Sequence, residues 1–178
     1  ATLHLSSKNL DSIPVYHVVG RGRTTGFASI FFKVDDTYES YFGRRDGKPY
    51  RFIRKIYEGG YTKDIEIDFY YDEDKAVLKD NKNGTQMDIA VDDRIQDLLS
   101  ASYHLRNNYN LDGFEVGESI DLDMLFDDDG VFQFKLKYLG TIKKRFTKDK
   151  DERNRRNKTG KAMLKQGLVA MFSGILVV

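Results

Sequence analysis

Between residues 13 and 91, aromatic and β-branched residues alternate with polar ones at a period of two, the pattern of half-buried β-strands. The clearest two runs, residues 50–57 and 61–71, flank Gly59-Gly60, a pair suited to a two-residue hairpin turn. A hairpin closed there pairs Glu58 with Tyr61. That register places six apolar side chains on one face: Tyr50, Phe52, Ile56, Ile65, Ile67 and Phe69.

The same register predicts ion pairs on the other face, with Arg51 opposite Asp68 and Lys55 opposite Asp64. Arg54 falls on the apolar face, opposite Ile65. Two interpretations of Arg54 remain open. It is an edge residue whose charged end reaches water, or it points inward and contacts a ligand.

Similar alternation elsewhere predicts more strands, at residues 1–8, 15–23, 32–42, 119–126 and 131–139. Turns are expected at residues 72–75, 81–84 and 127–130, and residues 27–32 fit a helical turn as an alternative to a strand. This spacing predicts a mainly β protein. We expect an antiparallel meander that forms a strongly curved sheet or a partly open barrel.

One amphipathic helix is predicted at about residues 94–107, where Ile95, Leu98, Leu99 and Leu105 recur with helical spacing. Asp93 is the expected N-cap, with Gln96 three residues later. A single helix beside many strands would cover one face or plug one mouth of the curved sheet.

The composition changes this picture in two respects, the lack of cysteine and the distribution of charge. The chain has 178 residues, of which 40% are hydrophobic and 32% charged, and it has no cysteine. Disulfides, thiolate metal sites and cysteine nucleophiles are therefore excluded. The longest apolar run is residues 168–178, well short of the ~20 residues of a membrane-spanning helix.

The net charge of +1 conceals a strongly basic stretch, residues 143–165, with eleven Lys or Arg against three Asp or Glu. The remainder of the chain is acidic. We expect residues 1–140 to form the β domain with its helix. Residues 141–178 then form a basic segment and an apolar stretch, which are either separate or the last strands of the same domain.

The motifs of catalysis and cofactor binding are missing from the sequence. It has no Gly-x-Ser-x-Gly elbow, no phosphate-binding loop and no zinc helix of the His-Glu-x-x-His type. His4, His17 and His104 lack metal-ligand spacing, and no carboxylate partner lies near His104 in the sequence. We therefore expect a non-enzymatic protein without a cofactor or a metal.

Several spaced motifs resemble one bacterial family, the domain-of-unknown-function family 3108. The matching stretches are residues 20–27 (Gly-Arg-Gly-Arg-Thr-Thr-Gly-Phe), residues 32–40, Pro49-Tyr50-Arg51-Phe52 with Arg54, Glu58-Gly59-Gly60-Tyr61, and the helix at residues 96–106. The resemblance covers roughly residues 1–140. It implies an antiparallel β protein exported to the periplasm, whose leader has been removed.

Three functions from different classes remain open. The first is binding of a lipid or another apolar or amphipathic molecule on a concave face rich in Tyr and Phe, as opposed to a plain packed core. The second is a structural or protein-interaction role in the cell envelope, with Arg and Tyr in the contact surface. The third is binding of an anionic membrane or polymer through residues 143–165, although nucleic acid is the less favoured partner. The candidate ligand- or partner-binding residues are Arg21, Arg23, Tyr38, Arg51, Arg54, Tyr61 and Tyr103.

Overall fold

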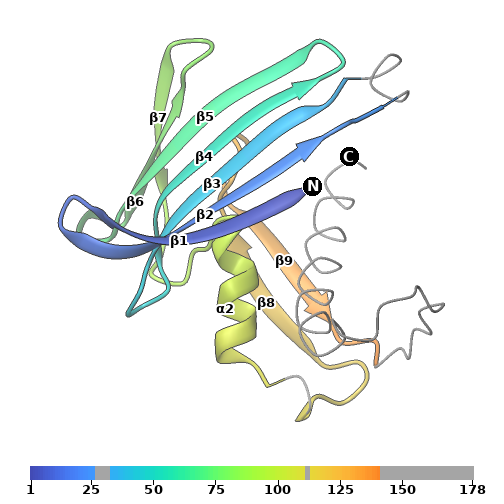
Figure 1. Ribbon diagram of the computed structural model, residues 1–178. Helices are drawn as coiled ribbons and strands as arrows, with labels where there is room; N and C mark the ends of the chain where they lie inside the picture. The colour runs from blue at the N-terminus through green and yellow to red at the C-terminus, as the bar shows by residue number, and fades with distance from the viewer. Residues whose placement is uncertain (27–32, 111–112, 141–178) are drawn as a thin grey trace.

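A seven-stranded antiparallel sheet dominates the computed structural model, which describes residues 1–26, 33–110 and 113–140 (Figure 1). Its strands follow one another in chain order, so each pairs with its neighbours in the sequence. The strands are β1 (Thr2–Leu10), β2 (Ile13–Arg23), β3 (Asp35–Gly43), β4 (Pro49–Glu58), β5 (Tyr61–Tyr70), β6 (Lys75–Asp80) and β7 (Thr85–Ala90).

The register of the β4–β5 hairpin is the one that the sequence predicts. Glu58 pairs with Tyr61, and Arg51 pairs with Asp68. Gly59 and Gly60 both have positive φ angles, 55° and 99°, which a two-residue turn of this kind requires and which glycine adopts without steric cost. The predicted meander of antiparallel strands is thus confirmed, and the sheet is open because β1 and β7 do not pair in the described residues.

Alternation divides the sheet into an apolar inner face and a charged outer face. One row of paired residues crosses the inner face: Leu5, Val18, Ser40, Phe52, Ile67, Leu78 and Met87. The five central residues of this row are buried, whereas Leu5 and Met87 lie on the edge strands and are nearly half exposed. The edges of the inner face are therefore its only accessible apolar positions in this row.

Two elements cover the inner face, a short helix and a second, two-stranded sheet (Figure 1). The helix is α2 (Ser100–Asn108), and the small sheet is a hairpin of β8 (Ser119–Met124) and β9 (Phe132–Lys137). The ring of Tyr103 on α2 packs against that of Phe42 on β3, with 5.0 Å between centroids. The hairpin contributes its own apolar side chains to the same core: Leu122, Met124, Leu125 and Phe126.

A segment before α2 joins the hairpin to the rest of the protein. Gln96 forms an isolated parallel bridge with Met124. The Gln96 amide donates to the Asp123 carbonyl at 3.0 Å, and the Leu125 amide donates to the Gln96 carbonyl at 2.9 Å. These two bonds tie the hairpin to the chain at a single position.

The helix begins later than the sequence predicts, with Leu99 as its N-cap residue, and the carboxylate that binds the amides at its start is Asp97 and not Asp93. The Asp97 carboxylate accepts hydrogen bonds from the amides of Leu99 and Ser100, both at 2.7 Å. The Ser100 hydroxyl accepts in return from the Asp97 amide, which completes a reciprocal cap. Asp93 instead forms an ion pair with Lys48. Residues 94–99 are thus an irregular segment of two turns and the Gln96 bridge rather than helix, and Ile95, Leu98 and Leu99 from this segment are buried in the core.

The other predicted elements agree within a few residues. A short 3₁₀ helix, η1 (Tyr71–Glu73), makes the β5–β6 turn, and the predicted turns at residues 81–84 and 127–130 lie between strands. The alternatives for residues 27–32 and the division at residue 141 fall largely outside the described residues.

Candidate functional site

An arginine in the apolar inner face is the first unusual feature of the fold. Arg54 lies on β4, a strand paired on both sides, and is only 8% exposed. Its Nη1 donates to the Asp127 carboxylate, which comes from the turn of the β8–β9 hairpin. Arg54 is therefore neither on an edge nor at the surface, so the interpretation as a solvent-reaching edge residue is wrong.

Lys63 of β5 binds the same carboxylate as Arg54 and also a second one closer to the surface. Its ammonium contacts both Asp127 and Asp128, the latter at 2.5 Å. Two cations of the sheet therefore meet two carboxylates of the hairpin turn. We call this group the turn cluster: Arg54, Lys63, Asp127 and Asp128.

The electrostatics of the turn cluster favour its charged form. Burial alone would raise the pKa of Asp127, but hydrogen bonds from Asp128 and Lys63 and the charge of Arg54 lower that pKa to about 2. Burial opposes the charge of Arg54, yet Asp127 and the Tyr38 hydroxyl together raise the pKa of Arg54. One donor is left over, since the buried Nε of Arg54 has no hydrogen-bond acceptor among the described residues.

A carboxyl pair lies beside the turn cluster. Asp36 accepts a hydrogen bond from the Tyr57 amide at 3.1 Å, and burial together with the neighbouring Glu58 raises its pKa to about 6. Tyr38 pairs directly with Arg54, and burial raises the pKa of its phenol to about 12. At neutral pH, Tyr38 is therefore a neutral hydrogen-bonding group next to a charged one.

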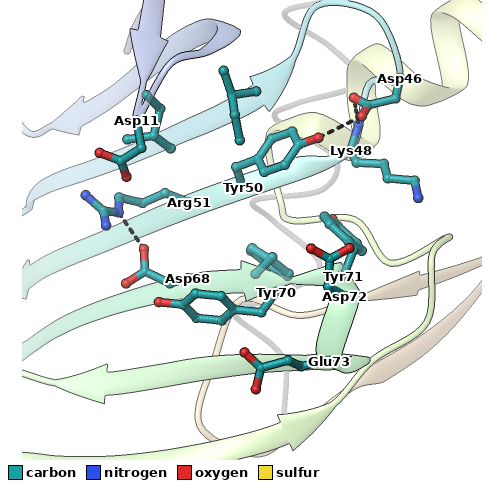
Figure 2. A pocket seen from close by; sticks show the side chains of 13 residues that line it. Asp11, Asp46, Lys48, Tyr50, Arg51, Asp68, Tyr70, Tyr71, Asp72 and Glu73 are labelled. Carbon is teal, nitrogen blue, oxygen red and sulfur yellow. Dashed lines mark hydrogen bonds and ion pairs between the residues drawn. The ribbon is translucent and has the colours of Figure 1, made fainter.

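A cavity of about 450 Å³ opens at one end of the sheet, where the β1–β2, β3–β4 and β5–β6 turns come together (Figure 2). Three tyrosines line it, namely Tyr50, Tyr70 and Tyr71. Its charged side chains are five carboxylates and two cations: Asp11, Asp46, Asp68, Asp72 and Glu73, with Lys48 and Arg51. We call it the strand-end cavity.

Internal contacts hold part of the wall of the strand-end cavity. Arg51 Nε donates to Asp68 at 2.6 Å, and the Tyr50 hydroxyl donates to Asp46 at 2.8 Å (Figure 2). The Tyr71 hydroxyl donates to the Pro49 carbonyl at 2.6 Å. Burial and the neighbouring Asp46 raise the pKa of Tyr50 to about 12, so its phenol stays protonated at neutral pH.

Neither a metal centre nor a membrane-spanning helix is found where the structure describes the chain. No three of its His, Asp and Glu side chains group closely enough to hold a metal ion. Its helices are too short and too polar to cross a lipid bilayer.

A family model described as "Protein of unknown function (DUF3108)" matches residues 1–155. The chain belongs to the DUF3108 family. The match extends past the strands and into the basic stretch that begins at residue 143. A search of curated proteins and a search of solved structures gave no match.

The fold of this DUF3108 protein separates the residues that the sequence groups together. Tyr38 and Arg54 meet on the inner face, and Tyr103 packs on the same side of the sheet through Phe42. Tyr61 lies at the β4–β5 turn and is 55% exposed. The remaining candidates are on the outer face, where Arg51 pairs with Asp68 and Arg21 and Arg23 are exposed.

His104 also lies apart from the turn cluster. Its ring neighbours are Asn108 and Tyr109 on or next to α2, and burial lowers its pKa. It is a half-buried helix residue without a carboxylate partner in the described chain, as the sequence indicates.

Sequence reasoning missed Asp127, the partner of Arg54, and Lys63, the second cation that binds Asp127. Asp127 is 73 positions from Arg54 in the chain, and both missed residues occur in patterns typical of exposed turns and strands. The one usable signal was Arg54 itself, because a charge within an alternating apolar face requires an oppositely charged partner. Asp127, in the polar turn of the last predicted hairpin, was an available carboxylate.

Proposed function

We propose that this DUF3108 protein is an exported, non-enzymatic protein of the cell envelope that binds an amphipathic molecule between its curved sheet and the β8–β9 hairpin. The observation that carries the proposal is Arg54, a buried arginine whose Nε lacks an acceptor. Its only ion-pair partner in the described chain, Asp127, belongs to the β8–β9 hairpin that covers the inner face. An anionic headgroup can take the place of the Asp127 carboxylate on such a guanidinium.

The β8–β9 hairpin is attached to the large sheet in a way that would let it move away from the inner face. The hairpin is not paired with the large sheet, and a backbone bridge at Gln96 and the turn cluster attach it. Between these two attachments it contributes apolar side chains, including the stacked rings of Phe126 and Phe132, whose centroids are 4.7 Å apart. If the turn cluster opens, this surface and the inner face become available to an apolar tail.

Accessible apolar side chains on the inner side of β1 support the same reading. Leu3 and Leu5 face inward by their register with Gly20 and Val18, yet they are 40% and 48% exposed. An apolar chain that lies along this edge would bury them. Each buried methylene contributes about 0.8 kcal/mol, which is enough for micromolar binding of a long tail.

The proposed role is a non-enzymatic one. An acid–base site would need Arg54, Glu58, Tyr61 and His104 to converge on one cleft. Glu58 and Tyr61 are paired at the β4–β5 turn, whereas His104 lies on α2 with Asn108 and Tyr109 as its neighbours, which supports a role without catalysis.

Lipid extraction and a fluorescent probe test the binding site. The purified protein is extracted and analysed by mass spectrometry, and N-phenyl-1-naphthylamine is titrated with and without oleate as a competitor. We expect oleate to displace the probe, and Asp127→Asn to bind oleate several-fold more tightly because the internal competitor for Arg54 is weakened. Asp129→Asn, in the same turn, is the matched control.

The proposal fails if no amphiphile co-purifies and neither the wild-type protein nor the Asp127→Asn variant binds the probe. Export is tested separately. Cells that produce the protein with its native N-terminus are fractionated, and recovery in the cytoplasm would overturn the periplasmic location.

A second candidate, protein interaction in the envelope, is favoured by Arg21 and Arg23. Both are exposed on the outer face of β2, next to the open edge strand β1. Arg54 and Tyr61 do not belong to this surface, since they lie on the inner side of the sheet. Anionic binding through residues 143–165, outside the described residues, remains a prediction whose test is a steep loss of binding with salt.

A further inference from the structure

The strand-end cavity is a second concave site, on a part of the molecule that the amphipathic ligand does not use. Its volume of about 450 Å³ lies within the range of small-molecule sites. Two of its five carboxylates form ion pairs, Asp68 with Arg51 and Lys79 and Glu73 with Lys75, which leaves Asp11, Asp46 and Asp72 without an ion pair among the described residues. Both cations form ion pairs, Arg51 with Asp68 and Lys48 with Asp93, and the charge of Arg51 also acts on Asp11.

Two carboxylates of the cavity have no partner among the described residues. Asp11, in the β1–β2 turn, and Asp72, on η1, make no hydrogen bond or ion pair through their side chains. Figure 2 places them on opposite sides of the cavity, with Tyr50 and Tyr70 between them. Both carboxylates are exposed, and the charge of Arg51 acts on Asp11 without an ion pair, so a cation between them would be attracted mainly by Asp72.

The wall of the cavity already holds one ammonium group in the manner that such a ligand would need. The Nζ of Lys48 lies over the ring of Tyr71, 4.7 Å from its centroid. Tyr70 is the next ring in the chain and is 43% exposed, and no Lys or Arg of the described chain lies over it. Its face is available for the same kind of contact.

Size distinguishes an organic cation from a metal ion. The carboxylates of the described residues do not gather in threes at metal-ligand distance. A metal ion needs several oxygens within about 2.6 Å, whereas an alkylammonium ion is bound by aromatic faces and by carboxylates several ångströms away.

We propose that the strand-end cavity binds a small organic cation, with its ammonium group over the ring of Tyr70 and between the carboxylates of Asp11 and Asp72. The three tyrosine rings provide the apolar surface for its carbon atoms. The site is separate from the turn cluster, so its occupancy does not depend on the proposed amphipathic ligand.

Choline and its neutral isostere 3,3-dimethylbutan-1-ol form a matched pair of probes, with nearly the same shape and different charge. Titration calorimetry on the full chain should detect choline binding at roughly millimolar Kd or tighter, and at least several-fold weaker binding of the neutral alcohol. Choline binding should also weaken with added salt.

Variants locate the site. Tyr70→Leu should weaken choline binding about two- to fivefold through loss of the ring, and Asp11→Asn with Asp72→Asn should weaken it further. Asp129→Asn, an exposed carboxylate in the β8–β9 turn, is the charge-matched control and should have no effect. Circular dichroism verifies that each variant is folded.

Equal binding of choline and the neutral alcohol would overturn the proposal, as would no choline binding at roughly 10 mM. Binding that Asp129→Asn weakens as much as the cavity variants do would also overturn it, because it would show a non-specific charge effect. Failure here leaves the oleate experiment unaffected.

Discussion

Arg51 and Arg54 lie three residues apart on β4 and face opposite sides of the sheet. Arg51 is on the outer face with its side chain 31% exposed, and its partner Asp68 also binds Lys79 at 2.9 Å. Arg54 is on the inner face with Asp127 as its ion-pair partner in the described chain. The outer face thus has a redundant network of ion pairs, whereas Arg54 on the inner face has one ion pair in the described chain, with Asp36 and Tyr38 nearby.

For these two arginines, the number of partners and the burial matter more than the residue type. On the outer face, solvent and a second cation compensate for the loss of one partner. On the inner face, the loss of one partner leaves a charge in an apolar environment. The arginine on the inner face is therefore the one that connects separate parts of the fold.

Removal of Asp127, the ion-pair partner of Arg54, should destabilise the protein most. Asp127→Ala leaves Arg54 buried without its ion-pair partner and should lower the free energy of unfolding by about 3–5 kcal/mol. Urea denaturation measures this loss. Asp128→Ala removes a more exposed carboxylate of the same turn and should cost no more than about 1 kcal/mol. Similar losses for both variants would contradict the special role of the inner face.

The next effect is the titration of the inner carboxyl groups. Burial raises the pKa of Asp97 to about 6, despite its hydrogen bonds from Ser40 and from the start of α2, and the pKa of Asp36 is also about 6. Between pH 4 and pH 6 the native state therefore binds more protons than the unfolded state. The free energy of unfolding should fall as the pH rises through this window.

Asp97→Asn isolates the contribution of Asp97. Asparagine keeps an oxygen acceptor for the two amides, and its side-chain amide can donate to Ser40, but it has no ionisation to lose. The difference in the free energy of unfolding between the variant and the wild-type protein should shift in favour of the variant by up to about 3 kcal/mol when the pH is raised from 4 to 7.5. Urea midpoints at the two pH values test this, and an unchanged pH dependence would show that Asp97 does not titrate in this range.

A smaller effect is expected on the outer face. Arg51→Ala should cost only about 0.5–1 kcal/mol because Lys79 still pairs with Asp68. The double variant with Lys79→Ala should lose more than the sum of the two single variants, since Asp68 is nearly buried and would then have no cation. Additive losses in this double-mutant cycle would show that the network is not redundant.

The smallest effect is predicted for the exposed arginines of β2. Reversal of both charges, Arg21→Glu with Arg23→Glu, should change the free energy of unfolding by less than about 0.5 kcal/mol. A pull-down from envelope extracts with the same variant then tests the interaction role without interference from instability. An unchanged set of captured proteins would exclude this surface.

The sheet was predictable from the sequence because each strand and its register depend on residues that are close together in the chain. Alternation along one strand and a glycine pair in the next turn are sufficient to define the register of β4 and β5, and the structure has that register. The start of the helix was not predictable in the same way. Asp93 and Asp97 are both plausible caps, and only the sheet decides between them, since the Ser40 hydroxyl donates to Asp97 at 2.5 Å and Lys48 pairs with Asp93.

The candidate site was less predictable than the fold. The sequence singled out Arg54 and Tyr38 but not the carboxylate that pairs with Arg54. Three turns line the cavity of Figure 2, and their proximity depends on the twist and length of the strands. No motif within a single turn indicates that a cavity forms there. Tyr70 and Asp72 look like ordinary turn residues until Asp11 is placed beside them.

The order of the strands also sets the order in which the protein can fold. Every strand of the large sheet pairs with the strand just before it in the chain, so the sheet can grow by one hairpin at a time from the N-terminus. The links across the inner face span much longer loops, 57 positions from Ser40 to Asp97 and 73 from Arg54 to Asp127. Long loops close more slowly than single hairpins, so we expect the docking of the hairpin to come late in folding and to be among the first contacts to open.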